Sequence, residues 1–315
     1  MRRFAALYHE LDASPGTAAR VEALATYFRG AEPADAAWAL QVLLGKQGRR
    51  LITGRRLRQI CLEGSSLPDW LFDECYAQVG DSAETIALLW AQVASDQLPP
   101  PGDSAAQRPL HQWMEELLPA AAGLDADRQA EAVRGLWRGL EPGELLVANK
   151  LLTGGLRVGV AQGLVLRALA RISGLEETVL QHRLMGGFTP SAEAFRALLG
   201  PADPAETVPS RPYPFFLASP LQGELPGGAG EWLVEWKFDG IRGQLIRRSG
   251  EGFLWSRGEE LINAGFPELI AASAALPEGT VLDGELLVWP PQAPRPAPFS
   301  ELQRRLGRRL RAAGC

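Results

Sequence analysis

The sequence predicts a multidomain protein in which an all-α domain precedes an α+β domain. Three observations support this prediction. Apolar residues recur at helical spacing through residues 1–200, residues 201–230 are rich in proline and glycine, and short aromatic and branched runs separated by glycine follow. A length of 315 residues also suits two domains, because single hydrophobic cores usually stop growing near about 250 residues. We therefore expect domains at 1–200 and 231–315, with a linker or domain entry at 201–230.

The first domain is predicted to consist of helices throughout. Apolar residues three and four positions apart give each expected helix one buried face. The clearest stripes are Phe4, Leu7, Tyr8 and Leu11, then Val21, Leu24, Ala25 and Phe28, then Ile86, Leu89, Trp90 and Val93, then Val133, Leu136, Trp137 and Leu140, and then Leu164, Val165, Ala168, Leu169 and Ile172. Turn-forming stretches at 65–69, 97–104 and 187–191 are expected to separate helices.

The second domain is predicted to be mainly sheet, with helices interleaved. Short runs of branched and aromatic residues bounded by glycine are typical of strands. Such runs lie at 232–238, 243–248, 252–256 and 280–289, and helical patterns lie at 264–275 and 299–311. This mixture predicts an α+β or α/β domain rather than an all-β one.

The composition is that of an ordinary soluble globular chain. Hydrophobic residues make up 46% of it, and no stretch approaches the roughly 20 apolar residues of a membrane span. The N-terminus has no long apolar run or cleavage site, so we expect mature, cytoplasmic sequence. The three cysteines and three histidines lack ligand spacing, which argues against a disulfide framework and a zinc site.

Lysine is scarce in this chain. Of 32 basic residues, only Lys46, Lys150 and Lys237 are lysine, and the others are arginine. An amine can lose its proton and attack an electrophile, whereas a guanidinium stays charged. A lysine that persists is therefore a candidate for chemistry that arginine cannot perform, although composition bias alone also leaves a few lysines.

The segment EWKFDGIRG at 235–243 carries the strongest chemical signal, and it is predicted to lie on a strand that runs into a glycine turn. The pattern Lys-x-Asp-Gly-x-Arg should occur by chance in roughly 3 of 1,000 chains of this length. A lysine amine attacks only when neutral, and nearby cations favour that form. Arg242, Arg257 and a bound Mg²⁺ would supply such a field. We therefore expect Lys237 to be a nucleophile.

This motif resembles that of the covalent nucleotidyltransferase superfamily of DNA ligases, RNA ligases and mRNA capping enzymes, in which such a lysine forms a phosphoramidate with the nucleotide. Three further segments resemble later motifs in the family's order. They are SRGEE at 256–260, VLDGELLVW at 281–289 and FSELQRR at 299–305. Upstream, NKLLTGGLRVGV at 149–160 resembles the end of the helical DNA-binding domain of cellular-type DNA ligases, which favours a DNA ligase.

Two N-terminal segments, MRRFAALYHELD and PDWLFDECY, are similar to a bacterial ATP-dependent DNA ligase group of the DNA damage response. The resemblance implies an all-α N-terminal DNA-binding domain followed by an ATP-grasp-like α+β adenylation domain. It implies ATP and Mg²⁺ as cofactors and nicked double-stranded DNA as the partner. The implied reaction is nick sealing through a covalent lysyl-AMP intermediate, in DNA repair, replication and recombination. RNA ligase or capping chemistry is the alternative within the superfamily.

The resemblance also assigns roles to individual residues. Carried over by motif, the implied sites are Glu235 near the adenine, Arg257 near the phosphates, Glu285 near the ribose or metal, and Phe299 on the adenine face. Apart from the resemblance, we expect Arg242 to stabilise phosphate charge, and Asp239 and Glu285 to bind Mg²⁺ or the ribose through oxygen atoms. Each has a structural alternative. Asp-Gly pairs are frequent in hairpin turns, a phenylalanine that opens an amphipathic helix often packs in a core, and a lysine or arginine often faces solvent.

Basic residues gather in two places, 46–58 and 304–311. Such clusters suit contacts with DNA phosphates through counterion release, and the alternative is a solvated protein face. A net charge of −5 does not exclude this, because local patches matter more. The residues expected to contact DNA are Lys46, Arg49, Arg50, Arg55 and Arg157.

The family's later elements have no counterpart in this sequence. These are a second glutamate strand, a lysine strand that holds the α-phosphate, and an OB-fold domain. No lysine follows Phe299. We therefore expect a truncated adenylation domain, an N-terminal fragment that seals nicks weakly or not at all. A DNA-binding fragment without catalysis is the alternative from another class.

Overall fold

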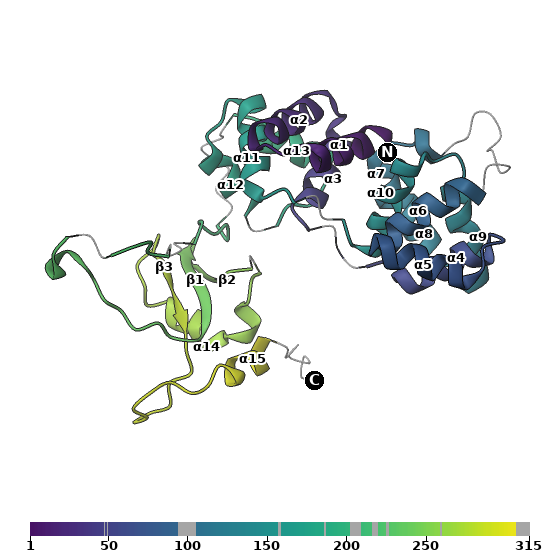
Figure 1. The fold of residues 1–315 in the computed structure, drawn as a ribbon. Coiled ribbons are helices and arrows are strands. Elements are labelled where there is room, and N and C mark those ends of the chain that lie inside the picture. Colours follow the sequence, from purple (N-terminus) through teal and green to yellow (C-terminus); the bar gives the residue numbers. More distant parts are fainter. Residues whose placement is uncertain are drawn as a thin grey trace, which may run out of the picture. The chain divides into compact units, whose positions relative to one another are not determined.

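The computed structural model describes residues 1–306 except 47, 49, 94–104, 157–158, 186, 202–208, 216–219, 225–226 and 259. The chain divides into two compact units. We call Met1–Leu180 with Phe188–Pro201 the helical unit, and Gln181–Gly187 with the residues from Ala202 onward the sheet unit (Figure 1).

The helical unit is built from helices, as the periodicity predicts. Their bounds are α1 Arg2–Ala13, α2 Thr17–Gly30, α3 Pro33–Leu43, α4 Gly54–Glu63, α5 Asp69–Val79, α6 Ser82–Val93, α7 Leu110–Gln112, α8 Leu118–Ala122, α9 Ala126–Trp137, α10 Pro142–Thr153, α11 Gln162–Ser173, α12 Glu177–Leu184 and α13 Ala192–Leu199, with a 3₁₀ turn at Ala105–Gln107 and a π-helical turn at Trp113–Leu117. Of the expected breaks, 187–191 lies between helices, 65–69 does so up to residue 68 because α5 begins at Asp69, and 97–104 lies outside the described residues. The last turn of α12 belongs to the sheet unit.

Side-chain caps explain where several helices begin. Thr53, Asp125 and Ser191 each accept a hydrogen bond from the backbone N–H three residues on, at the starts of α4, α9 and α13. Glu141 and Glu144 form a reciprocal capping box at the start of α10. These bonds satisfy backbone donors that have no partner within the helix.

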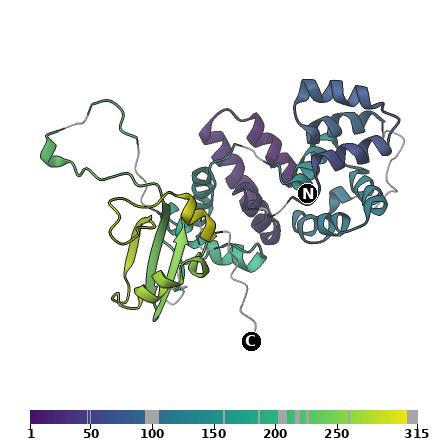
Figure 2. The same ribbon diagram turned by 90° about the horizontal axis from the view of Figure 1, so that it is seen from below.

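Helices that are far apart in sequence pack together in the helical unit. The pairs α2 with α11, α3 with α13, and α6 with α10 make its main contacts, and Figure 2 shows purple and teal helices side by side. The predicted apolar stripes supply the core; Leu11, Leu24 and Val165, for example, are fully buried. None of the helices in the described part of the chain combines the length and apolar character needed to cross a membrane.

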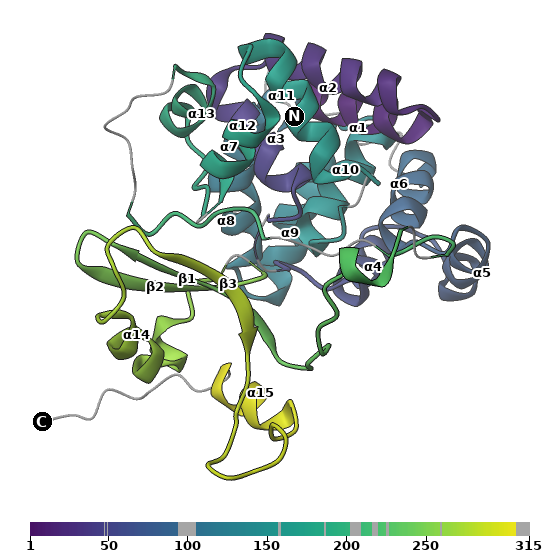
Figure 3. The same ribbon diagram turned by 90° about the vertical axis from the view of Figure 1, so that its left-hand side faces the viewer.

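The sheet unit is centred on an antiparallel three-stranded sheet in the order β2-β1-β3. The strands are β1 Ile241–Arg248, β2 Glu251–Ser256 and β3 Val281–Leu286, the helices are α14 Pro267–Ser273 and α15 Ser300–Leu306, and 3₁₀ turns lie at Ala229–Glu231 and Asn263–Gly265. Helix α14 lies against the sheet (Figure 3). The core beneath it is formed by Ile241, Leu254, Ile262, Phe266 and Leu302.

Side chains alternate along each strand, so the sheet has two different faces. Ile241 and Leu245 of β1 point toward the apolar cluster, together with Leu254 of β2. The alternate residues Arg242 and Gln244 occupy the opposite face. One face packs on the apolar cluster. The other, which we call the polar face, carries Arg242 and Gln244 next to the buried apolar residues Ile246 and Trp255.

The prediction of a strand at 232–238 is wrong. Strand β1 begins only at Ile241, and the preceding residues have no regular structure. Within the described residues no strand pairs with this segment, and Leu233, Val234 and Trp236 are more than four-fifths exposed. Branched and aromatic residues favour a strand only where a neighbouring strand covers them.

Residues 210–213, which belong to the predicted linker or domain entry, run along the polar face of the sheet. The buried Gln244 side chain accepts a hydrogen bond from the Tyr213 backbone N–H at 2.6 Å and donates one to the Tyr213 carbonyl at 3.1 Å. The Trp255 indole donates to the Ser210 carbonyl at 2.6 Å, and Arg248 donates to the Arg211 carbonyl at 3.1 Å. Part of the predicted linker is thus a fixed component of the sheet unit.

His182 provides a pH-dependent contribution to the sheet unit. Its ring lies 5.2 Å from that of Tyr213, and burial, together with Arg211 and Arg248, lowers its pKa below the ordinary 6.5. Between the two values the unfolded chain binds the proton and the folded chain does not. The stabilisation is therefore present above pH 6.5 and is lost as the pH falls toward the lowered folded pKa.

We expect His182→Gln to flatten the fall in the free energy of unfolding between about pH 7 and 5, the range around the ordinary histidine pKa. Urea titrations of both proteins across this range would measure the effect. If the free energy of unfolding falls as steeply with pH in the variant as in wild type, His182 is not the cause of the fall.

Candidate active site

Lys237 lies in the exposed segment before β1, where its amine is open to solvent. Among the described residues it has no hydrogen bond or ion pair. One residue further on, the Phe238 ring contacts the Trp289 ring edge to face, with 5.9 Å between centroids. This contact joins the lysine segment to the chain that follows β3.

Gly240 brings the lysine segment against β3. Its backbone N–H donates a hydrogen bond to Glu285 Oε1 at 3.1 Å. A Cβ at this position would lie 2.2 Å from the Leu286 carbonyl oxygen, so only glycine permits the approach. The Asp-Gly pair therefore makes a close backbone contact beside Glu285.

Strand pairing brings further motif residues together. Arg242 lies opposite Glu285 in the β1–β3 register, and its Nε pairs with Asp283 Oδ1 at 2.8 Å. The backbone N–H of Arg257, which follows β2, donates to the Arg242 carbonyl at 3.1 Å. Residues from three separated motifs thus meet at the end of the polar face nearest Lys237.

From the sequence, Asp283 received no role of its own within the segment 281–289, and its pairing with Arg242 was missed. The signal was present, because Asp283 and Glu285 are two residues apart on a strand and share a face. With Arg242 on the neighbouring strand, alternation predicts a carboxylate pair beside a guanidinium. The structure places Asp283 in the predicted group.

The side chains of four other predicted site residues lie differently. Glu235 and Asp239 are exposed in the segment around Lys237, and the Arg257 side chain is exposed in the turn after β2. Phe299 is half-buried against the apolar cluster, on the face of the sheet opposite Arg242 and Glu285. The structure does not bring Phe299 together with the polar group, which accords with the core alternative.

The predicted DNA-contacting residues belong to the helical unit. Arg50 and Arg55 are exposed, Lys46 is half-buried, and Arg49 and Arg157 lie outside the described residues. Two other members of the basic cluster are engaged within the protein. Arg56 donates to the Ala126 carbonyl and to Gln129, and Arg58 pairs with Asp73 at 2.8 Å and lies over the Phe72 ring. Fewer basic side chains of the 46–58 cluster are therefore available to contact phosphates than the sequence suggests.

The fold and this polar group define a class of protein: an all-α unit joined to an α+β unit that carries a Lys-x-Asp-Gly-x-Arg motif beside a carboxylate pair. The family model "DNA ligase N terminus" matches residues 1–170, and "ATP dependent DNA ligase domain" matches residues 222–313. The chain belongs to the ATP-dependent DNA ligase family.

Relatives named "Probable DNA ligase" agree with this assignment. The protein from Opitutus terrae is 27% identical over 98% of this chain and 37% of its own length. The one from Koribacter versatilis is 28% identical over 92% of this chain and 50% of its length, and the one from Anaeromyxobacter sp. Fw109-5 is 30% identical over 68% and 45%. The chain spans half or less of the length of these curated relatives.

Proposed function

We propose that the protein seals nicks in duplex DNA through a covalent lysyl-AMP intermediate, with Lys237 as the nucleophile. The observation that carries the proposal is the arrangement around Gly240. The exposed lysine amine precedes a turn that is hydrogen-bonded to Glu285, and Arg242 lies directly across the strand pair. These contacts support the proposal, because they connect the segment of Lys237 and Arg242 with the carboxylate of Glu285 from a separate motif.

In the first step the neutral Lys237 amine attacks the α-phosphorus of ATP. The N–P bond forms, the bond to the pyrophosphate oxygen breaks, and the amine proton is released to solvent. Charge spreads over the phosphate oxygens, where guanidinium groups stabilise it. Arg242 and Arg257 are the residues we assign to this role. The 5′-phosphate of the nick then attacks the lysyl-AMP phosphorus, which breaks the N–P bond and frees Lys237. Attack by the 3′-hydroxyl on that 5′-phosphate forms the phosphodiester and releases AMP.

The carboxylates near Lys237 suit a hard divalent cation. Among the described residues, no three histidine, cysteine, aspartate or glutamate side chains gather as a metal site. Mg²⁺ is often held by only one or two carboxylates together with waters and substrate phosphates. Asp239 and Glu285 would fill that role, Glu285 being fixed by the Gly240 N–H. Bound there, the ion would neutralise phosphate charge.

In the helical unit we assign duplex contact to Lys46, Arg49, Arg50, Arg55 and Arg157. The exposure of Arg50 and Arg55 supports their part in this assignment. Basic side chains of this kind bind phosphates whatever the base sequence. We place the activity in DNA repair, replication and recombination in the cytoplasm.

The proposal predicts which nucleotide the protein uses and which nucleic-acid ends it joins. Labelled ATP should transfer AMP to the protein, labelled GTP should not transfer GMP, and nicked DNA should be sealed in preference to RNA ends. The assay is run on the 315-residue chain and on a protein of the relatives' full length. Equal use of GTP, or a preference for RNA ends, would favour the capping or RNA ligase alternative.

A DNA-binding role without catalysis is tested separately. Binding of a nicked duplex that survives removal of residues 206–315, with no AMP transfer in either protein, would support that function instead.

A further inference from the structure

The helical unit contains a polar cavity that the proposed reaction does not use. Its volume is about 230 Å³, and it lies among the starts of α4 and α6 and the end of α10. The residues that line it are Arg50, Gly54, Asp81, Ser82, Ala83, Lys150, Thr153 and Gly155. Lys150 is one of the three lysines in a chain that otherwise uses arginine.

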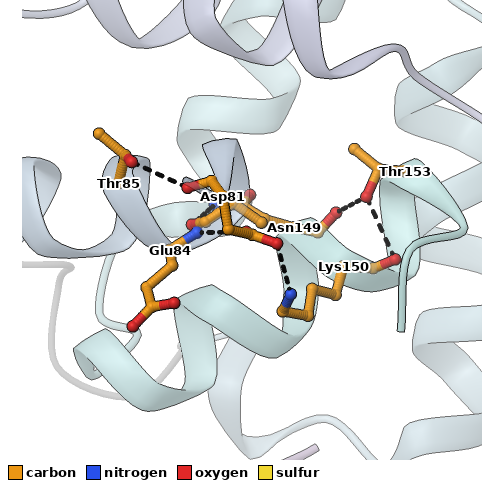
Figure 4. Close-up of polar contacts among 7 residues, drawn as sticks. Asp81, Glu84, Thr85, Asn149, Lys150 and Thr153 are labelled. Carbon is orange, nitrogen blue, oxygen red and sulfur yellow. Dashed lines mark hydrogen bonds and ion pairs between the residues drawn. The ribbon is translucent and has the colours of Figure 1, made fainter. Parts of the chain in front are cut away.

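Lys150, which lines the cavity, pairs with Asp81, and Figure 4 shows this pair. Its Nζ lies 2.8 Å from Asp81 Oδ2, and its side chain is only 13% exposed. The other carboxylate oxygen, Oδ1, accepts the Glu84 backbone N–H at 3.0 Å and caps α6. Burial alone would raise the pKa of Asp81, but the bonds from Lys150 and the α6 backbone outweigh it and lower that pKa. The Asp81 carboxylate is therefore charged at neutral pH.

The walls of the cavity are fixed by backbone and buried side chains. The N–H groups of Leu51 and Ile52 both donate to the Leu152 carbonyl at 3.0 Å, which places Arg50 beside the end of α10. The fully buried Asn149 accepts the Trp137 indole N–H at 2.9 Å and donates to the Ala83 carbonyl at 3.4 Å. The cavity thus lies where α10 packs on α6.

The charge balance of the cavity favours an anion. Arg50 and Lys150 contribute two positive charges and Asp81 one negative charge, which leaves one positive charge in excess. The N-termini of α4 and α6, whose backbone N–H groups carry partial positive charge, add to it. A compact lysine ammonium already 2.8 Å from a carboxylate can exchange that partner for a phosphate oxygen.

We propose that this cavity binds a phosphate group, with Lys150 and Arg50 as its cationic ligands and Asp81 as the internal competitor for Lys150. The phosphate comes either from the backbone of a DNA duplex or from free inorganic phosphate, and the two sources are separated by experiment. The inference deepens the proposed DNA contact. It fails independently of the proposed reaction, because AMP transfer to Lys237 does not involve the cavity.

The experiment compares two variants that should act in opposite directions in the full chain. Lys150→Ala removes the ligand and should weaken binding. Asp81→Asn keeps a residue able to cap α6 and removes the competitor, so it should strengthen binding on the order of fivefold, the scale of one partly exposed charge pair. Arg128→Ala, which removes an exposed charge from α9, is the control.

Two probes separate the sources of phosphate. Affinity for a nicked duplex is measured against salt concentration, and Lys150→Ala should reduce the slope of log K against log salt by about 0.9, the value for one lost phosphate contact. Separately, inorganic phosphate should raise the thermal midpoint above that in chloride of equal ionic strength. If the variants change only the affinity for nicked duplex, the cavity binds a phosphate of the DNA backbone. If they change only the rise in thermal midpoint with inorganic phosphate, it binds the free ion.

The proposal is overturned if Lys150→Ala and Asp81→Asn shift both probes in the same direction, or if both behave like Arg128→Ala. If Lys150→Ala does not fold, Asp81→Asn decides alone. Unchanged or weaker binding of both probes by Asp81→Asn would overturn the proposal.

Discussion

Lys237→Ala is expected to abolish transfer of AMP from ATP to the protein, by at least about a thousandfold, the scale seen when a covalent nucleophile is removed. The reason is chemical, since no other lysine lies in the sheet unit to form the phosphoramidate. Incubation with α-labelled ATP followed by denaturing gel electrophoresis measures the transfer, on the 315-residue chain and on a protein of the relatives' length.

Lys237→Arg is the matched variant, because it keeps the positive charge and removes the ability to attack as a neutral amine. It should be as inactive as Lys237→Ala. Both variants should unfold within about 0.5 kcal/mol of wild type, as exposed substitutions usually do. Labelling of either variant at the wild-type level would show that Lys237 is not the nucleophile.

Gly240→Ala is expected to damage both the stability and the chemistry of the sheet unit. The new methyl group would lie 2.2 Å from the Leu286 carbonyl oxygen and 2.8 Å from Leu287 Cδ2, so the turn must move away from β3. We expect a loss of about 1–3 kcal/mol in the free energy of unfolding, the usual cost of overpacking. The Gly240–Glu285 hydrogen bond breaks as well, so AMP transfer should fall with it.

Gly284→Ala is the control from the facing strand. A Cβ there meets no atom within 4 Å, so this variant should keep both its stability and its activity. Urea unfolding and ATP labelling of the two variants measure the contrast. Equal behaviour of Gly240→Ala and Gly284→Ala would mean that the close approach at Gly240 does not matter.

The helices could be predicted because their signal is local. Apolar spacing alone fixes which side of each helix is buried, as with Phe4 and Leu11 in α1. The segment proposed to carry the chemistry could also be identified, because Lys237, Asp239 and Arg242 lie within six residues. In both cases the information is contained in a short stretch of chain.

The remaining features depend on contacts between distant residues. Whether 232–238 forms a strand depends on a neighbour that its own sequence does not specify. Phe299 could belong to a core or a nucleotide site until the position of the apolar cluster is known. The pairing of Lys150 with Asp81 joins residues 69 positions apart, which no local pattern predicts.

The two-faced sheet makes the site sensitive to the length of β1. Residues on a strand alternate between faces, so one inserted residue reverses the face of every residue beyond it. An insertion between Ile241 and Arg242 would turn Arg242 toward the apolar cluster and Leu245 away from it. Folding and chemistry in this unit therefore depend on the same alternation of side chains along β1. The strand can accept substitutions far more easily than changes in length.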